Sequence, residues 1–450
     1  MTFTIIVTIG LDSSKVIIYW YIIVCCSLQQ WCQYLTVDND DILDKLEREK
    51  FDIAVMDAFI GCVYLIPHRL QIPFITCGLT LDPLTVRVPW LPSFVPNVLF
   101  PFSDQMTFIE RLKNTAASIV IPLIIPLCSD MEQEVLDKFR RYGYFSSPSE
   151  LVSKSALWFL TRDDVLDYPQ PMMPNMVNVG GLTVKRATGE LPPDIKNFLD
   201  GAKKGGILVS FGSAMSRIPA HMVEKFSEAF GRLDGYRVIW RLKNVDNVKL
   251  ADNVLIRQWL PQNDILAQLS VKLFISHGWQ NSQYEALYHA VPMITFPVMT
   301  DQLYNAKRFD HKGFGLSMNL HDFTADQLLD NINTILQDRS YKERITKASE
   351  IFRSQVQSPV ERATFWIEHV CRFGSDHLRS AGNDLPLYSY LMLDVLALFL
   401  ITLHIIIYLL CKLLKLIANK CCVVLNNTSK KNNWHRCSVN FTVKWTSLLF

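Results

Sequence analysis

The amino-acid sequence predicts an α/β protein with parallel sheets, because short apolar strands alternate with helical segments. In the second half of the chain the predicted strands are Ile207–Phe211, Tyr236–Trp240, Leu273–Ser276 and Met293–Phe296. A helix over Met222–Leu233 separates the first two strands, and a helix that opens near Asn281 separates the last two. Consecutive strand–helix–strand units form parallel sheets, which bind ligands in the crevice beyond the carboxyl ends of their strands.

The first half of the chain gives weaker signals. Residues 1–28 are apolar in two patches and have a weak signal-sequence or anchor character. Asp38–Glu49 predicts a helix with the acidic start that the helix dipole favours, and Phe51–Met56 predicts a strand that ends at Asp57. Leu91–Ser129 is apolar and interrupted by prolines, which fits an acceptor pocket, a membrane-facing surface or core packing.

The composition limits the classes of function. The net charge is +2, from 45 basic and 43 acidic residues, so no electrostatic argument favours a nucleic-acid partner. The 11 cysteines show neither a disulfide framework nor the spacing of metal ligands. We therefore predict no metal site and no nucleic-acid binding.

A membrane-spanning helix is predicted near the C-terminus, over residues 391–411. Val395–Cys411 is almost wholly apolar, and with the residues before it the segment reaches the ~20 residues that cross a bilayer core of about 30 Å. A buried helix of a soluble protein is the alternative. Lys412 and Lys415 follow at once, and the positive-inside rule places residues 412–450 in the cytosol and the preceding body in the lumen.

Several polar side chains gather near the ends of the two strands around the Asn281 helix. They are His277, Asn281, Ser282, Glu285, Asp301 and Gln302. A helix N-terminus presents unpaired N–H groups, so a diphosphate can lie against Asn281, Ser282 and the imidazole of His277. Glu285, one turn further on, can accept from both hydroxyls of a ribose. Asp301 and Gln302 can accept from sugar hydroxyls, so the set fits a nucleotide sugar. The alternative is that Asn281 and Ser282 only cap the helix and that His277 is a turn histidine.

Trp259 precedes a turn stiffened by Pro261 and is a candidate platform for a base. Stacking of a base on an aromatic ring contributes about 1–3 kcal/mol in single-strand binders. The alternative is a tryptophan of the core.

Seven segments together resemble the UDP-glucuronosyltransferase family of UDP-glycosyltransferases, of the animal membrane type and nematode-like. They are KFDIAVMDA (50–58), SDQMTFIERLKN (103–114), PNMVNVGGL (174–182), VSFGS (209–213), WLPQNDIL (259–266), KLFISHGWQNSQYEALYHAVPMITFPVMTDQ (272–302) and RATFWIEHVCRFGSDHLR (362–379). The resemblance implies a GT-B fold, with two Rossmann-like domains, of which the N-terminal one is incomplete, and a C-terminal transmembrane helix. The implied divisions are a non-family segment 1–28, a partial acceptor domain 29–173, a UDP-sugar-binding domain 174–383 whose last helices return to the first domain, the membrane helix 391–411 and the tail 412–450.

The same resemblance implies an activity and its partners. The activity is a metal-independent, inverting transfer of glucuronate or glucose from a UDP-sugar to a hydroxyl of a small lipophilic acceptor. The UDP-sugar is a co-substrate, and no cofactor is expected. Gly212, Ser213, Trp259, Gln262 and Gly278 join the polar set above as donor-binding residues. An endoplasmic-reticulum membrane enzyme of detoxification is implied, with the bilayer and a homo- or hetero-dimer with family members as partners.

Asp57 matches the aspartate that, in the family, holds the ring of the catalytic histidine. That histidine has no counterpart, since no histidine precedes His68, which falls in a predicted helix. The sequence therefore resembles an N-terminally truncated family member, and the alternative function is a catalytically dead or truncated relative that binds UDP-sugar or associates with complete members. Trp279 stands where the family has glycine, and its indole could crowd a phosphate.

Overall fold

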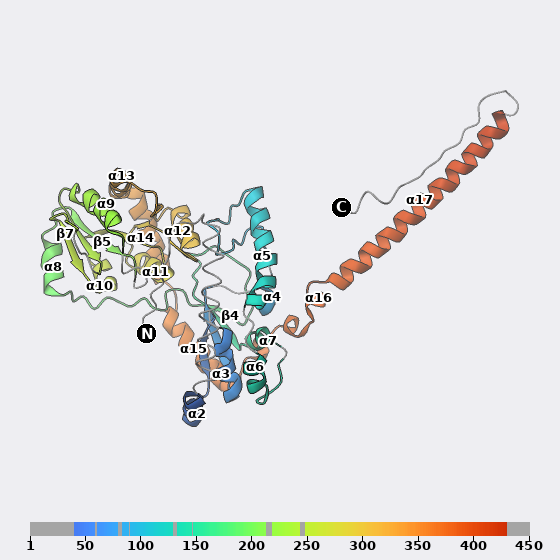
Figure 1. Ribbon diagram of the computed structural model, residues 1–450, viewed down its shortest axis with the longest axis horizontal. Coiled ribbons are helices and arrows are strands. Elements are labelled where there is room, and N and C mark those ends of the chain that lie inside the picture. The colour runs from blue at the N-terminus through green and yellow to red at the C-terminus, as the bar shows by residue number, and fades with distance from the viewer. Residues whose placement is uncertain are drawn as a thin grey trace. The chain divides into compact units, whose positions relative to one another are not determined.

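The computed structural model describes residues 40–58, 61–79, 83–89, 91–128, 133–145, 147–212, 218–243 and 248–429. The chain divides into two compact units, Met1–Ser380 and Ala381–Phe450. The first unit contains two parallel sheets with helices, which confirms the predicted α/β class (Figure 1).

The first sheet has four parallel strands in the order β1-β2-β3-β4. Their bounds are β1 Ala54–Asp57, β2 Phe74–Gly78, β3 Leu157–Leu160 and β4 Met176–Asn178. The helices of this part are α2 Asp40–Glu49, α3 Leu65–Leu70, α4 Pro83–Val86, α5 Phe108–Cys128, α6 Gln133–Arg140 and α7 Pro148–Ser153. Within the described sheet β1 lies at the edge, and Val55 in it is 51% exposed. An apolar edge of this kind favours pairing with a further strand.

The second sheet has six parallel strands in the order β10-β9-β8-β5-β6-β7. Their bounds are β5 Gly205–Ser210, β6 Tyr236–Arg241, β7 Val254–Arg257, β8 Val271–Ser276, β9 Met293–Thr295 and β10 Gly315–Ser317. The helices are α8 Pro193–Asp200, α9 Ala220–Gly231, α10 Gln262–Leu266, α11 Gln280–Tyr288, α12 Gln302–His311, α13 Ala325–Gln337 and α14 Arg339–Arg353. The predicted strands and helices of this half are therefore present, with ends that differ by a few residues.

Both faces of the second sheet are buried, as alternating side chains of one strand show. Ile207 and Val209 of β5 belong to one apolar cluster, whereas Leu208 between them belongs to another. Helices α9 and α13 contribute to the first cluster, and α8, α10, α11 and α14 contribute to the second. Strands buried on both sides are nearly continuous in apolar residues, which explains why these strands could be recognised in the sequence.

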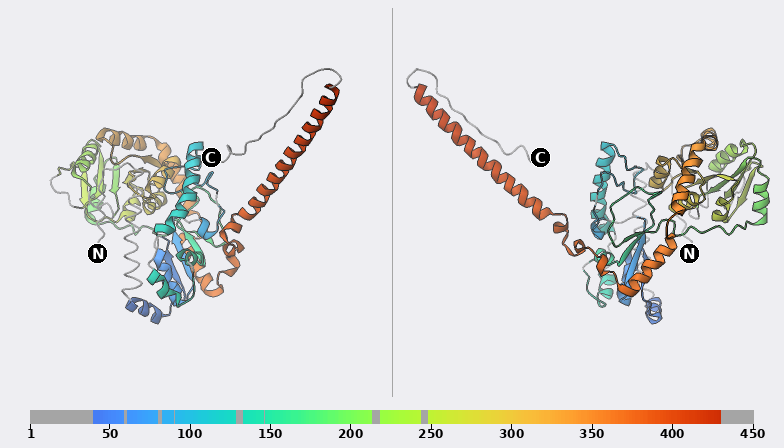
Figure 2. Two further views of the ribbon diagram at one scale, coloured as in Figure 1. Left: turned by 45° about the vertical axis from the view of Figure 1, so that its right-hand side comes forward. Right: turned by 180° about the vertical axis from the view of Figure 1, so that it is seen from behind.

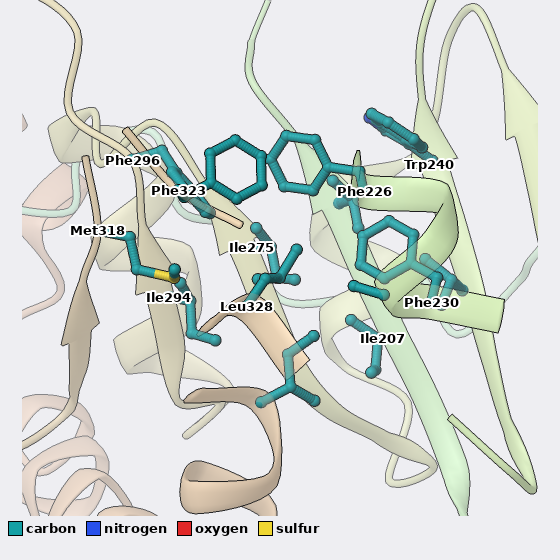
Figure 3. Packing of buried hydrophobic residues seen from close by; sticks show 14 of the residues in the cluster. Ile207, Phe226, Phe230, Trp240, Ile275, Ile294, Phe296, Met318, Phe323 and Leu328 are labelled. Atoms are coloured by element: carbon teal, nitrogen blue, oxygen red, sulfur yellow. The ribbon is translucent and has the colours of Figure 1, made fainter. Parts of the chain in front are cut away.

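Aromatic rings fill the cluster under α9 (Figure 3). Phe226 lies 5.4 Å from the ring of Trp240 and 5.3 Å from that of Phe296, both in edge-to-face geometry. Phe230 meets Trp240 from the other side at 5.7 Å. Edge-to-face pairs add about 0.5–1.5 kcal/mol each to the free energy gained by burial, so these contacts stabilise the packing of α9 on the second sheet.

The apolar segment 91–129 contains the long helix α5. Phe108 is 68% exposed and Leu112 57% exposed on this helix, whereas Asn114 is fully buried. The Asn114 amide donates to the carbonyls of Pro92 and Val95 and accepts from the N–H of Asn97. The Asn114 amide therefore fixes the helix to the preceding loop. Because Phe108 and Leu112 are exposed, only part of this apolar segment packs in the core.

Helix α15 (Pro359–Phe373) packs on the first sheet. Ala363 and Val370 of this helix share an apolar cluster with Ile75, Leu157 and Phe159. Its N-terminus carries a capping box between Ser358 and Glu361, which fixes where the helix begins.

The second unit contains α16 Leu387–Tyr390 and the long helix α17, Leu393–Ser429 (Figure 2). Within it, Leu393–Cys421 is long and apolar enough to cross a membrane, with mean hydropathy 2.5 over its most apolar window. The helix does not end at Cys411, where the predicted span ends, but continues through Lys412, Lys415 and Lys420. Lysine is a good helix former, so the charges that mark a membrane boundary do not end the helix.

Candidate functional site

The candidate site lies at the carboxyl ends of β5 and β8, which are adjacent parallel strands with Ser210 paired to Ser276. His277 follows β8 directly, and Gly212 lies two residues beyond β5. Gly212 has φ +71°, and a Cβ at this position would stand 2.9 Å from Cε1 of His277. Only glycine fits both the backbone angle and the space, so the two strand ends meet at this imidazole.

His277 is buried, with 1% of its surface exposed. Its Nδ1 lies 3.2 Å from the Ser276 hydroxyl, whereas Nε2 has no hydrogen-bond partner among the described residues. The Ser210 hydroxyl at the same edge also lacks a partner there. Buried polar atoms without partners are rare, because each costs free energy. Two of them at one sheet edge indicate a place for a polar ligand.

Burial lowers the pKa of His277 to about 4. The imidazole is therefore neutral near pH 7. If the Ser276 hydroxyl donates to Nδ1, the ring proton resides on Nε2, which then donates to a ligand oxygen.

Helix α11 begins at Gln280, immediately after this histidine. Its N-cap residue is Trp279, which makes no side-chain capping hydrogen bond. Asn281 and Ser282 lie inside the first turn, so they are not the caps that the alternative interpretation required. A first turn without a side-chain cap keeps N–H capacity for an anion. The Trp279 ring stands 5.6 Å from the His277 ring, edge to face, and is 44% exposed.

Three of the predicted donor residues meet one turn further along α11. The Gln262 amide donates to Oε2 of Glu285 at 2.5 Å and to the Ser282 hydroxyl at 3.4 Å. Burial raises the pKa of Glu285, and the Gln262 hydrogen bond opposes this effect. Gln262 therefore orients the Glu285 carboxyl and favours its charged form.

Trp259 is not a core residue, because 67% of its surface is exposed. Trp259 lies three residues before Gln262, the first residue of α10. Its exposed ring is therefore close in sequence to the Gln262–Glu285 pair. An exposed flat ring retains the capacity to stack on a base.

Asp301 and Gln302 lie at the N-terminus of α12. Asp301 accepts from the Thr300 hydroxyl at 2.9 Å and from the Asn305 amide at 2.7 Å. Gln302 is buried, and its Oε1 accepts from the backbone N–H groups of Val298 and Met299. The Gln302 amide oxygen therefore shapes the loop after β9, and contact of either residue with a sugar stays a prediction.

The remaining predicted site residues are Gly278, Ser213 and Asp57, and they lie in different parts of the chain. Gly278, with φ +83°, makes the turn after His277. Ser213 lies outside the described residues. Asp57 ends β1 in the first sheet, where its charge, together with burial, raises the pKa of the Cys77 thiol.

His68 lies in α3, and its ring contacts the segment that follows α6. Its Nε2 lies 3.0 Å from the carbonyl oxygen of Gly143, and its ring meets Phe145 edge to face at 5.1 Å. Burial lowers its pKa. The structure therefore brings Gly212 to His277 and Gln262 to Ser282 and Glu285 at the second sheet, and it places Asp57 at the end of β1 in the first sheet.

The sequence reasoning missed a buried polar cluster next to this site. Asp167 accepts from Arg308 of α12 and from the hydroxyl of Tyr284 of α11. Arg162 donates to the carbonyl of Tyr168, and its guanidinium lies 3.9 Å from the Asp167 carboxylate. The only available signal was the cluster of carboxylates in residues 163–167, which is far from either helix in the sequence.

Two parallel sheets flanked by helices, with polar side chains at the carboxyl ends of adjacent strands, define the structural class of the protein. The sequence profile described as "UDP-glucoronosyl and UDP-glucosyl transferase" matches residues 14–430, and the chain belongs to this family. The match begins at residue 14, inside the segment 1–28 that the motifs left outside the family, whereas the first recognised motif begins at residue 50.

The similar proteins include UDP-glucuronosyltransferases and a galactosyltransferase. The chain is 34% identical over 370 residues to a 2-hydroxyacylsphingosine 1-beta-galactosyltransferase of Rattus norvegicus, covering 80% of this chain and 67% of the relative. It is 33% identical over 368 residues to UDP-glucuronosyltransferase 1-2 of Rattus norvegicus, covering 80% and 68%. It is 32% identical over 401 residues to a UDP-glucuronosyltransferase of Pleuronectes platessa, covering 87% and 84%.

Solved structures with the same fold are glycosyltransferases. The glycotransferase of kitacinnamycin aligns with a TM-score of 0.54 at 18% identity, covering 80% of this chain and 83% of that one. A UDP-glucosyltransferase from Polygonum tinctorium capable of glucosylating indoxyl, in complex with 3,4-dichloroaniline, aligns with a TM-score of 0.54 at 14% identity, covering 81% and 84%. These likenesses confirm the GT-B fold.

Proposed function

We propose that the protein transfers glucose or glucuronate from a UDP-sugar to a hydroxyl of a small lipophilic acceptor, with inversion at the anomeric carbon. Membership of the family supports sugar transfer in general. The observation that supports this donor best is the buried, unpartnered Nε2 of His277 beside the N-terminus of α11.

Each part of the donor has a matching group. The diphosphate lies against the first turn of α11 and accepts from Nε2 of His277. The ribose hydroxyls donate to the Glu285 carboxylate, which Gln262 orients. The uracil stacks on the exposed face of Trp259, and the sugar hydroxyls reach Asp301 and Gln302.

In the reaction, the acceptor oxygen forms a bond to the anomeric carbon while the bond from that carbon to the UDP oxygen breaks. UDP leaves with the bonding pair, and the hydroxyl proton passes to a base. The neutral His277 stabilises the charge that develops on the diphosphate by donating a hydrogen bond. We assign to Asp57 the role of the aspartate that holds the base, and we assign no residue as the base itself.

A second candidate function is a relative that binds UDP-sugar with little turnover, alone or with complete family members. The hydrogen bond of His68 to Gly143 favours it, because this bond occupies the Nε2 atom that a base would use. In both cases we propose an endoplasmic-reticulum membrane protein with the α17 helix in the bilayer. The basic residues Lys412, Lys415 and Lys420 support a cytosolic C-terminus and a luminal body.

Calorimetry of the full chain in detergent tests the donor site. UDP should bind the wild type, and Glu285→Ala should weaken binding by about tenfold, as expected for the loss of charge-assisted hydrogen bonds. Glu343→Ala, an exposed glutamate of α14, is the matched control. Equal affinities of all three proteins would remove Glu285 from the site.

Turnover separates the two candidates. The first candidate, an active transferase, is supported if the wild type transfers sugar to a simple phenol and the rate falls in Asp57→Asn. Binding of UDP without transfer supports the second candidate, and robust transfer that Asp57→Asn leaves unchanged contradicts the role of Asp57.

A further inference from the structure

Asp167 lies in the turn that follows β3 and joins this turn to two helices of the second sheet. It is 2% exposed. Its Oδ2 accepts from the Tyr284 hydroxyl at 2.9 Å and from the N–H of Asp163 at 3.1 Å, and its Oδ1 accepts from the Arg308 guanidinium. One carboxylate therefore contacts α11 through Tyr284 and α12 through Arg308.

The two helices are also tied to each other at this place. Arg308 donates to Oε1 of Gln283 at 2.7 Å, and the Gln283 amide donates to the carbonyl of Asn305 at 2.8 Å. Arg308, Gln283 and Asn305 are all fully buried. The Asn305 amide then donates to Asp301 at 2.7 Å. A continuous chain of hydrogen bonds thus leads from Asp167 to a predicted sugar-binding residue.

The turn itself is held firmly against the second sheet. Leu166 is fully buried in the cluster that contains Tyr284 and Phe352. Gly180 leaves room for the Tyr284 hydroxyl, because a Cβ there would collide with it. Asp167 is therefore presented by a packed turn, so its carboxylate is a fixed reference for both helices.

We propose that Asp167 is a positioning residue for sugar transfer. It sets the separation between the N-terminus of α11, which takes the diphosphate, and Asp301 at the start of α12, which takes the sugar. This inference rests on the proposed donor site. In the proposed site a UDP-sugar reaches both α11 and α12, whereas UDP does not reach α12, so an error in the separation weakens UDP-sugar binding more than UDP binding.

The direct substitution Asp167→Ala leaves Arg308 buried without its carboxylate and risks loss of folding. Tyr284→Phe is the gentler variant, because it removes only the hydroxyl that bonds Asp167. Ser349→Ala is the matched control: its buried hydroxyl donates to the carbonyl of Tyr288, at the other end of α11, at 2.7 Å. Both variants delete one buried hydroxyl next to α11, but only Tyr284→Phe breaks the link to Asp167.

The test measures by calorimetry the dissociation constants of UDP, UDP-glucose and UDP-glucuronate for the full chain. The UDP-sugar that binds the wild type more tightly is then compared with UDP. In Tyr284→Phe the ratio of UDP-sugar to UDP dissociation constants should rise about fivefold, the effect of one net hydrogen bond. In Ser349→Ala the ratio should not change. Equal weakening of both ligands in Tyr284→Phe, or the same ratio change in both variants, overturns the proposal.

Hydrogen exchange keeps the two proposals distinguishable. If the wild type binds no UDP, the proposed donor site is wrong. The exchange rates of the α12 amides then test whether Asp167 links the two helices. Faster exchange over Gln302–His311 in Tyr284→Phe alone supports the link, and equal exchange in both variants contradicts it.

Discussion

The imidazole of His277 lies against the backbone of Gly212, so that a single methyl group at residue 212 would stand 2.9 Å from Cε1 of the ring. The ends of β5 and β8 therefore meet at one neutral histidine whose Nε2 has no partner in the described part of the chain.

Gly212→Ala should abolish measurable UDP binding, because the added Cβ must displace the His277 ring. Gly189→Ala is the control for backbone strain: its φ is +81°, close to the +71° of Gly212, but a Cβ there meets nothing within 4 Å. Both variants pay about 1–2 kcal/mol for the left-handed conformation. Calorimetry should find that only Gly212→Ala loses UDP; equal losses would refute the steric argument.

Gln262→Ala should weaken UDP binding by about fivefold, because the Glu285 carboxyl loses the hydrogen bond that orients it and favours its charge. Gln268→Ala is the control, since that amide also lies near α10 but donates to the carbonyl of Asp264. The two dissociation constants, measured at pH 7, give the comparison. An effect of Gln268→Ala as large as that of Gln262→Ala would contradict a specific role for the pair.

Trp259→Ala should weaken UDP binding by about 1–3 kcal/mol through loss of base stacking. The thermal unfolding midpoint should scarcely change, because the ring is 67% exposed. Inorganic pyrophosphate, which has no base, should compete with UDP equally well in the variant and the wild type. A large fall in the unfolding midpoint would instead identify Trp259 as a structural residue.

Acid should destabilise the protein through His277. Its pKa is about 4 in the fold against 6.5 when unfolded, so between these values the unfolded chain binds more protons and the free energy of unfolding decreases as the pH is lowered. The loss from pH 7 to pH 5 is about 2 kcal/mol for this group. Burial also lowers the pKa of His289 to about 4, which adds a smaller loss because that ring is partly exposed.

Denaturant titrations of His277→Gln at pH 7 and pH 5 check this prediction. The variant should lose less free energy of unfolding between the two pH values than the wild type. His221→Gln, which removes an exposed histidine of α9, should behave like the wild type. A pH dependence that His277→Gln leaves unchanged would show that other groups govern it.

The sequence was sufficient for the second sheet because its signals are local, whereas the donor-binding role of the residues at its edge stays a prediction. Continuous apolar strands followed by polar turns placed His277, Glu285 and Gln262 within a short stretch, and the structure joins Gln262 to Glu285. The Asp167–Arg308 pair could not be foreseen, since 141 residues separate its members and each residue alone resembles a surface charge. Helix α17 extends beyond the predicted membrane span, because the lysines that mark a membrane boundary also favour helix.

The exposure of the Trp259 and Trp279 side chains could not be predicted from the sequence either. Burial depends on which neighbours cover a ring, and both residues lie at turns whose neighbours come from distant segments. The composition of a turn predicts the turn, but not what lies over it.

A comparison of UDP with uridine tests most directly whether a diphosphate binds at His277. We expect calorimetry to find that the wild type binds UDP at least about tenfold more tightly than uridine, and that His277→Ala removes most of this difference while leaving uridine binding unchanged. Equal affinity of the wild type for UDP and uridine, or a preference for UDP that survives in His277→Ala, would contradict the assignment of this strand end as the diphosphate site.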